Sequence, residues 1–166
     1  NNAHEEGPFS PERCGGLPSG QVAELVGSGR LSDWDAARTF LHRAGGVRAY
    51  LGTGDLVEVE RRVEAGDAHA RAVLDAMAYQ VGKAIGAYAA ALAGAVDAVL
   101  LTGGAARCTP LVAAITPLVD WIAPVRVYPG EDELAALAEG AARVLGGLEP
   151  ARDYVSSVLT DDQETR

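Results

Sequence analysis

The clearest pattern in the sequence is a stripe of apolar residues that recurs every three or four positions between residues 67 and 93. Its members are Val73, Leu74, Met77, Val81, Ile85, Tyr88 and Leu92. This spacing is that of one face of an α-helix, and Asp67 precedes the stripe as a capping residue. The pattern predicts a long helix with a core-facing stripe, in which Gly82 and Gly86 would let another backbone approach closely.

Shorter helical patterns precede this segment. One predicted helix runs from Ser32 to the Gly45–Gly46 pair, which should end it. The next residues, 49–55, are expected to form a compact loop. Asp55 then caps a further helix, with Glu58 as the reciprocal partner of a capping box.

The periodicity changes after Gly94. Residues 98–101 form a continuous apolar run, typical of a strand buried on both faces, and residues 124–128 predict a second strand. Between them Thr109–Pro110 predicts a helix start, and Pro117 should kink or end that helix. An acid-led helix over 131–145 completes the order strand, helix, strand, helix, which implies a parallel crossover. Two strands cannot form a stable sheet alone, so we expect strands outside the chain to complete it.

Length, composition and charge narrow the class of protein. The 166 residues fit one domain over residues 1–150 with a polar tail over 151–166, and 48% of them are apolar. A net charge of -9 argues against nucleic acid or an anionic membrane as a partner, because both carry repelling phosphates. No segment is long and apolar enough to span a bilayer, so the cytoplasm is the expected location. Cys14 and Cys108 have no metal-binding spacing and are expected to be reduced, packed thiols.

Three segments could carry chemistry. Gly103, Gly104 and Ala105 follow the first predicted strand, where the ligands of open α/β sheets bind, although an ordinary tight turn would look the same. Asp132 and Glu133 follow the second strand. They suit either the dipole of a helix start or a magnesium ion beside bound phosphates.

The third segment contains Arg13, in a loop rich in Gly and Pro. Such an arginine could clamp a phosphoryl group during its transfer. The alternative is a surface salt bridge with Glu12 or Glu6.

Several blocks of the sequence, taken in their order and spacing, resemble the butyrate kinases, within the acetate and butyrate kinase family. The blocks are Asn2-Ala3-His4-Glu5-Glu6-Gly7-Pro8-Phe9-Ser10-Pro11-Glu12-Arg13 with Gly16-Leu17-Pro18, Ala49-Tyr50-Leu51-Gly52-Thr53, Ala76-Met77-Ala78-Tyr79-Gln80, Leu101-Thr102-Gly103-Gly104 and Tyr128-Pro129-Gly130-Glu131-Asp132-Glu133. The resemblance implies the helix-rich part of a ribonuclease-H-like (actin-like ATPase) α/β domain with a short parallel sheet. It also implies reversible transfer of the γ-phosphoryl group of ATP to butyrate or a similar short-chain acid, with Mg²⁺.

The resemblance also implies roles for individual residues. Arg13 falls where related kinases place an arginine at the transferring phosphoryl group. Gly103, Gly104 and Ala105 fall on the loop along the nucleotide. Asp55 matches an aspartate of the adenosine pocket, and Asp132 with Glu133 matches the acidic pair that helps to hold magnesium. The resemblance further implies ATP or ADP and Mg²⁺ as cofactors. It also implies that the protein forms a homodimer and that this chain works with a missing amino-terminal half.

The chain departs from the family in two respects. It carries Val57 where butyrate kinases usually have an arginine, which removes one charge near the nucleotide. It also begins at Asn1, without a methionine or the start of a fold. We therefore expect it to be a carboxy-terminal fragment that lacks the family's phosphate loops and does not turn over by itself. The alternatives are a kinase for acetate, propionate or a branched-chain acid, or a non-catalytic interaction module on the same scaffold.

Overall fold

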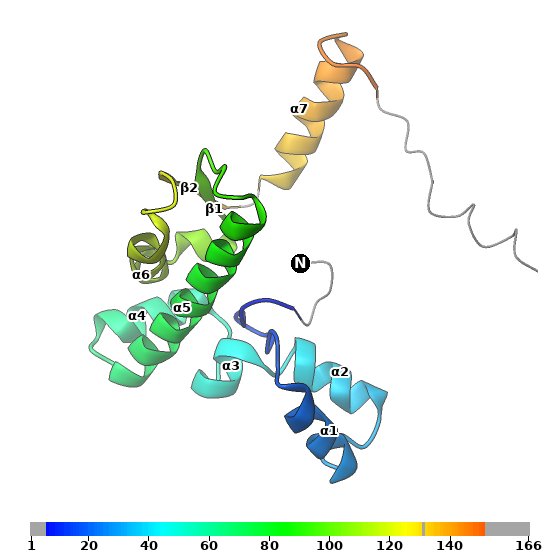
Figure 1. Cartoon of the computed structure of the whole chain (residues 1–166), viewed down its shortest axis with the longest axis vertical. Coiled ribbons are helices and arrows are strands. Elements are labelled where there is room, and N and C mark those ends of the chain that lie inside the picture. The colour runs from blue at the N-terminus through cyan, green and yellow to red at the C-terminus, as the bar shows by residue number, and fades with distance from the viewer. Residues whose placement is uncertain (1–5, 131, 152–166) are drawn as a thin grey trace, which may run out of the picture. The chain divides into compact units, whose positions relative to one another are not determined.

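The computed structural model of the chain describes residues 6–130 and 132–151, which fall into a first unit up to residue 131 and a second from Asp132 onward. The elements, coloured along the chain in Figure 1, are α1 (Ser19–Gly27), α2 (Trp34–His42), α3 (Gly46–Leu51), α4 (Leu56–Glu64), α5 (Ala68–Ala91), β1 (Val99–Gly103), the short 3₁₀ helix η1 (Gly104–Arg107), α6 (Thr109–Val119), β2 (Val125–Pro129) and α7 (Glu133–Leu145). All but α7 belong to the first unit.

The long helix α5 is the centre of the first unit. Asp67 caps it by accepting the N–H groups of His69 and Ala70, as the sequence predicted. Its closest helical neighbour is α6, and the close approach occurs at Gly82, where a Cβ would lie 3.0 Å from the Cβ of Leu118. The first three members of the predicted stripe, Val73, Leu74 and Met77, are buried.

Val81 and Ile85 are half-buried against the core, as predicted, but the last two members of the stripe do not match the prediction. Tyr88 and Leu92 are each 57% exposed. Gly86 likewise has no heavy atom within 4 Å of the position of a Cβ, so the close packing predicted there is wrong for the described part of the chain.

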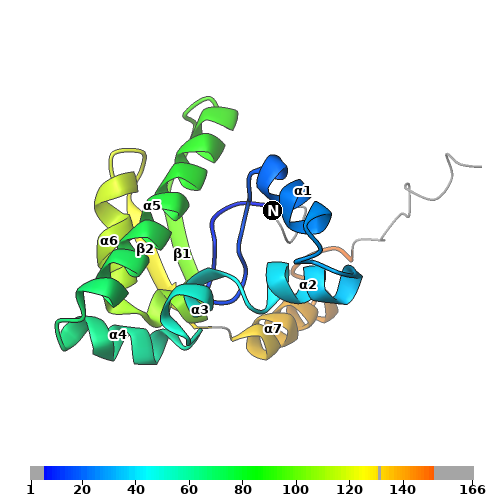
Figure 2. The same cartoon turned by 90° about the horizontal axis from the view of Figure 1, so that it is seen from below.

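β1 and β2 form a parallel sheet, which confirms the predicted strand order. Val99 pairs with Val125 and Gly103 with Pro129, so both strands end at the same edge. Burial alternates along β1, with Val99 buried and Leu100 60% exposed, so the expectation of a strand buried on both faces is wrong for the described residues. In the described part of the chain, α5 and α6 lie beside the two strands (Figure 2), and β1 pairs with one strand, β2.

Several predicted boundaries also change. Helix α2 is capped by Asp33, whose Oδ1 accepts the N–H of Ala36 at 2.8 Å, rather than beginning at Ser32. A carboxylate on an extended residue satisfies that N–H, and Ser32 donates its hydroxyl to the same side chain. Pro117 lies inside α6, which ends two residues later at Val119 and thus fits the expected stop.

The predicted loop over 49–55 is found only from Gly52 to Asp55, because residues 49–51 form the last part of α3. Gly45 and Gly46 do not simply end α2, which stops at His42, but begin the short helix α3. At the other end of the chain α7 begins at Glu133, and residue 131, where its start was predicted, lies outside the described residues. The polar tail predicted over 151–166 also lies outside them, apart from Ala151.

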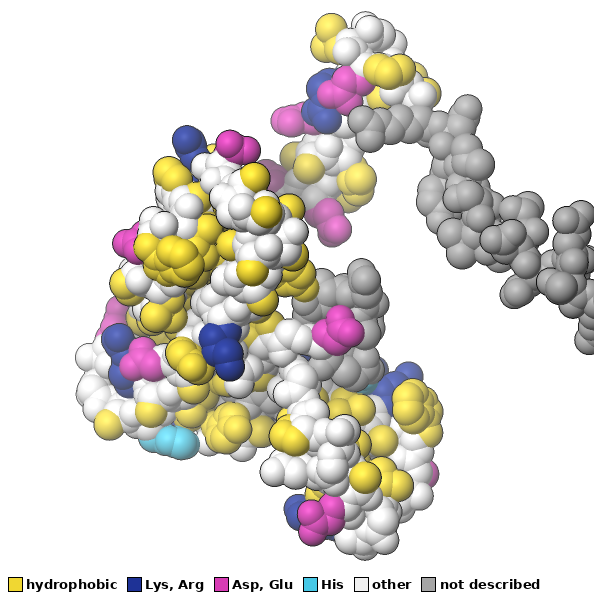
Figure 3. Space-filling model, in the orientation of Figure 1, with side chains coloured by type: hydrophobic (Ala, Val, Ile, Leu, Met, Phe, Trp, Pro, Cys, Tyr) yellow, Lys and Arg dark blue, Asp and Glu magenta, His cyan; other side chains and the backbone are white. Residues whose placement is uncertain are grey.

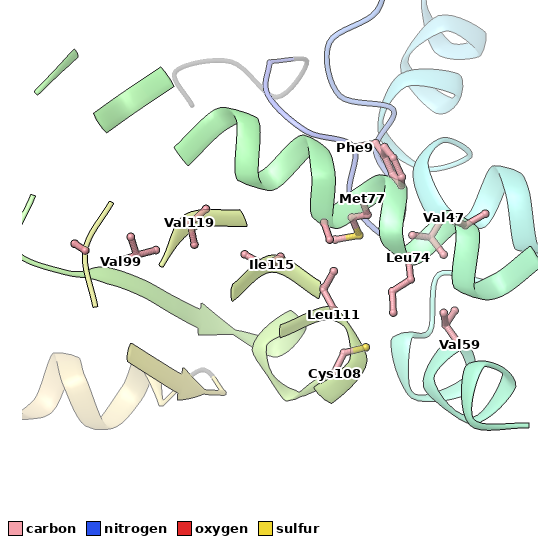
Figure 4. Close-up of a cluster of buried hydrophobic side chains, with 13 residues drawn as sticks. Phe9, Val47, Val59, Leu74, Met77, Val99, Cys108, Leu111, Ile115 and Val119 are labelled. Atoms are coloured by element: carbon pink, nitrogen blue, oxygen red, sulfur yellow. The ribbon is translucent and has the colours of Figure 1, made fainter. Parts of the chain in front are cut away.

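One hydrophobic cluster joins the loop before α1 to α3, α4, α5, β1 and α6 (Figure 4). Leu74, Val47, Val59 and Val119 are its most completely buried side chains. Cys108 belongs to it as a free thiol, as predicted, and burial raises the pKa of that thiol. Cys14 is half-buried and is not joined to Cys108 by a disulfide. None of the helices described is both long and apolar enough to cross a membrane.

Candidate functional site

Arg13 lies in a tight turn, residues 10–13, whose backbone is held by the beginning of α3. Three N–H groups there donate to carbonyls of the turn: Gly45 to Glu12 (3.0 Å), Val47 to Ser10 (3.0 Å) and Arg48 to Pro11 (2.9 Å). Within the turn, the N–H of Ser10 donates to the carbonyl of Arg13 and the N–H of Arg13 donates to Oγ of Ser10. Most backbone polar groups of residues 10–13 are therefore hydrogen-bonded, and these bonds fix the position of the Arg13 backbone.

Gly46 makes this close approach possible. Its φ is +62°, in the left-handed region that glycine tolerates best, and a Cβ there would lie 2.7 Å from the carbonyl oxygen of Arg13 and closer still to that of Ser10. The sequence identified Gly46 only as a helix end. The signal for its true role is the contact with residues 10–13, which is distant in the chain.

The Arg13 side chain itself is exposed. Glu12, the expected salt-bridge partner, instead pairs with Arg48. Within residues 6–130 and 132–151 the Arg13 guanidinium has no ion pair, which contradicts the surface salt-bridge alternative as far as Glu12 and Glu6 are concerned. A fixed backbone with an unpaired guanidinium suits the recognition of an external anion.

Asp55 lies beside this turn. Its Oδ1 accepts the N–H of Val57 at 2.9 Å and so caps α4, as predicted. Its own N–H donates to Oγ1 of Thr53 at 3.1 Å rather than to Glu58, so the predicted reciprocal bond is wrong. The preceding residue, Gly54, packs on the turn, since a Cβ there would lie 3.2 Å from the carbonyl oxygen of Pro11. The structure thus brings the Arg13 and Asp55 segments side by side.

Gly103, Gly104 and Ala105 form the passage from β1 into η1, at the carboxyl ends of both strands. Gly103 has φ +80° and ψ -177°, a conformation essentially restricted to glycine. Its carbonyl accepts the N–H of Gly130 at 3.0 Å, which joins this turn to the end of β2. Ala105 is half-buried and packs against the core, which fixes this side of the turn, whereas Gly104 is exposed.

Arg107, at the end of η1, is a basic residue that sequence reasoning missed. Its guanidinium lies against Gly130, where a Cβ would be 2.5 Å from Nη2. The position of Arg107 after the Gly-Gly turn would indicate a site residue only if the second strand were already known to end beside it.

Asp132 and Glu133 belong to the second unit, at the start of α7. Both are exposed, and the Asp132 side chain makes no capping hydrogen bond although it stands at the N-cap. A capping hydrogen bond therefore does not explain Asp132, whereas the dipole of the helix start still suits both acids. The described residues contain no group of three or more His, Cys, Asp or Glu side chains suited to a metal, so this pair would supply at most part of a coordination shell.

The fold of the chain is that of the carboxylate kinases in the solved structures it resembles. Acetate kinase from Porphyromonas gingivalis has a TM-score of 0.70 at 22% identity, over 84% of this chain and 41% of that one. Acetate kinase from Entamoeba histolytica also has a TM-score of 0.70, at 15% identity over 86% and 44%. A propionate kinase from Francisella tularensis has a TM-score of 0.65 at 18% identity, over 78% and 39%. These structures confirm a helix-rich α/β fold with a short parallel sheet, consistent with an actin-like ATPase domain.

The sequence identifies the family. The model of the Acetokinase family matches residues 6–116, and the chain belongs to this family. It is 48% identical over 154 residues to a protein described as "Probable butyrate kinase 2" from Caldanaerobacter subterraneus subsp. tengcongensis. That match covers 93% of this chain and 43% of the relative, so the chain spans less than half the length of this curated relative.

Proposed function

We propose that the chain is part of a butyrate kinase, which transfers the γ-phosphoryl group of ATP to butyrate and releases butyryl phosphate and ADP, reversibly. The observation that carries this proposal is the 48% identity to the probable butyrate kinase over almost the whole chain. The substrate carboxylate is itself the nucleophile, so the protein needs to position the groups and neutralise charge rather than supply a nucleophile.

Arg13 takes the role of neutralising charge on the phosphoryl group in transfer. Its support is the turn held by α3 together with a guanidinium that has no ion pair among the described residues. Preorganised charge of this kind stabilises the transition state because no reorganisation is needed during the reaction.

The nucleotide is bound by Asp55, Gly103, Gly104 and Ala105. Gly103 and Gly104 carry no side chain at the carboxyl edge of the sheet, so a ligand can approach the backbone there closely. The side chain of Val57, whose N–H donates to Asp55, is exposed and carries no charge at this position.

Mg²⁺ is held in part by Asp132 and Glu133. Carboxylate oxygens are hard ligands that fit this ion, and Mg²⁺ commonly completes its shell with phosphate oxygens and water. That pattern agrees with an acidic pair that is too small to form a metal site alone. When bound, the ion would supply charge neutralisation of the phosphates.

The rest of the full-length protein completes the sheet and the site. Leu100 on β1 is 60% exposed, and a pocket of about 340 Å³ beside it is lined by apolar side chains of α5, β1 and α6. Figure 3 shows hydrophobic side chains exposed over α5 and α6; Tyr88, Leu92 and Trp121 are among the exposed residues of that region. Part of this surface is covered by the upstream half, and part is available for a homodimer.

The test is a hydroxamate-trapping assay on the full-length protein with ATP, Mg²⁺ and, in separate reactions, acetate, propionate, butyrate and a branched-chain acid. The highest kcat/KM is expected for butyrate. A different preferred acid would replace the substrate but keep the kinase, whereas no acyl phosphate from any acid would overturn the proposal in favour of a non-catalytic module. The 166-residue chain alone is expected to be inactive and to bind ATP weakly or not at all.

A further inference from the structure

A long-range hydrogen bond connects α4 to the turn that follows β1. Oε1 of Glu60 on α4 accepts the backbone N–H of Thr109 at 3.0 Å, across 49 positions of sequence. Thr109 is the first residue of α6 and lies two residues after the end of η1, so the bond fixes the backbone just beyond the Gly103–Arg107 turn.

The beginning of α6 lacks a cap of its own. Cys108 occupies the N-cap position but makes no side-chain capping bond, and a thiol is a weak acceptor. Pro110 has no N–H to satisfy. The remaining donor at the first position of α6 is therefore met by a carboxylate from another helix, whose negative charge also suits a helix N-terminus.

Glu60 lies close to the core beneath the Gly103–Arg107 turn. Cys108 is 2% exposed, and Val59, which precedes Glu60, is fully buried in the same cluster. Glu60 therefore extends from a helix whose neighbouring side chain is locked into the core, and it reaches the adjacent α6 start from a fixed position. A lysine or a flexible surface acid would not give the same constraint.

From this geometry we propose that Glu60 is a positioning residue for nucleotide binding, which holds the Gly103–Arg107 turn in place through Thr109. The inference rests on the proposed function, because that turn is where the nucleotide would bind. Glu60 is assigned no contact with the nucleotide. It acts by coupling α4, which Asp55 caps, to the Gly103–Arg107 turn.

The test compares Glu60→Ala with Glu60→Gln in the full-length protein. Alanine removes the acceptor, whereas glutamine keeps an acceptor oxygen without the charge. Glu64→Ala is the matched control, since Glu64 lies on the same helix and is exposed. Thr109→Pro removes the donor instead, at a first helical position that proline tolerates, and serves if Glu60→Ala does not fold.

Two measurements are needed. The first is the KM for ATP, which should rise about fivefold in Glu60→Ala, the size expected for the loss of one intramolecular hydrogen bond, with a smaller change in kcat. Glu60→Gln and Glu64→Ala should remain within about twofold of the original protein. An unchanged KM in Glu60→Ala, or the same loss in Glu64→Ala, would overturn the proposal.

The second measurement is the rate of alkylation of Cys108 without nucleotide, followed by peptide mapping. The negative charge of Glu60 helps to raise the pKa of this thiol, so alanine and glutamine should both increase its reactivity for that reason. Only alanine should add an increase from loosening the turn. Equal rates in the two variants would overturn the role of the hydrogen bond. This comparison needs no turnover, so it remains decisive even if the full-length protein makes no acyl phosphate and the proposed function fails.

Discussion

Gly46→Ala is the sharpest perturbation of the site that leaves every candidate site residue unchanged. The new Cβ would lie 2.7 Å from the carbonyl oxygen of Arg13 and closer to that of Ser10, and both atoms are backbone. The turn can relieve the contact only by moving away from α3. The bonds from Gly45, Val47 and Arg48 to the turn would then lengthen or break.

The cost has two parts. Alanine at a positive φ loses about 1–2 kcal/mol relative to glycine. Losing one or two of the three bonds that hold the turn adds roughly 1–3 kcal/mol. For a domain of this size each kcal/mol lowers Tm by about 2–4 °C, so a fall of about 5–15 °C is expected. Because a displacement of about 1 Å in a catalytic group can cost about 100-fold, kcat should fall by a similar factor.

Gly52→Ala provides the matched control. Gly52 stands at the other end of α3 with φ +77°, but no heavy atom lies within 4 Å of the position of its Cβ. It should lose only the conformational part, about 1–2 kcal/mol, and keep kcat. The two variants are compared in the full-length protein by thermal unfolding and by hydroxamate trapping with saturating ATP. Equal losses of Tm and kcat in both would refute the view that α3 positions Arg13.

Three further predictions follow from single side chains. Arg13→Ala should lower kcat about 1000-fold with Tm unchanged, since its guanidinium has no ion pair among the described residues; a large fall in Tm would point to a structural role. Val57→Arg should lower the KM for ATP about two- to fivefold by adding a charge at an exposed position beside Asp55, and a raised KM would contradict this. The pKa of Asp67 lies below its ordinary 3.8, chiefly because its carboxylate accepts the N–H of Ala70 and then because Arg62 bonds to it. Its stabilising effect is therefore complete above about pH 4 and is lost as the pH falls through the lowered value, so Asp67→Asn should flatten acid unfolding below pH 4; identical acid curves would refute this.

The elements that the sequence predicted well are those with several local signals in agreement. In α5, the cap at Asp67, the spacing from Val73 onward and the length of the segment all indicate a helix, and the helix is found there. The parallel pairing of β1 with β2 follows from the helix between them. In α3, by contrast, Gly45 and Gly46 carry only the local signal of a helix end. Their contact with the Ser10–Arg13 turn decides the structure, and no local pattern encodes it.

The candidate site was predictable to the extent that its residues belong to short motifs. The turn at Gly103 and the cap at Asp55 appear where their motifs place them. Glu60 and Arg107 were missed because each acts on a segment distant in the sequence, respectively the start of α6 and the end of β2. A single acid on a helix or a single arginine after a turn is indistinguishable from a solvated surface charge until the fold is known.

The arrangement around Arg13 favours a site built on backbone rather than on side-chain partners. An ion pair would fix the guanidinium but would also neutralise it and compete with a phosphoryl group for its N–H groups. Here the neighbouring acid, Glu12, is engaged by Arg48 of α3, and the backbone of the turn is held by three peptide hydrogen bonds from the beginning of α3. The arginine is thus positioned without being neutralised. Because Gly54 packs on the same turn, a shift of α3 would move the Arg13 and Asp55 segments together, so variants of Gly46 should alter phosphoryl transfer and nucleotide binding in the same direction.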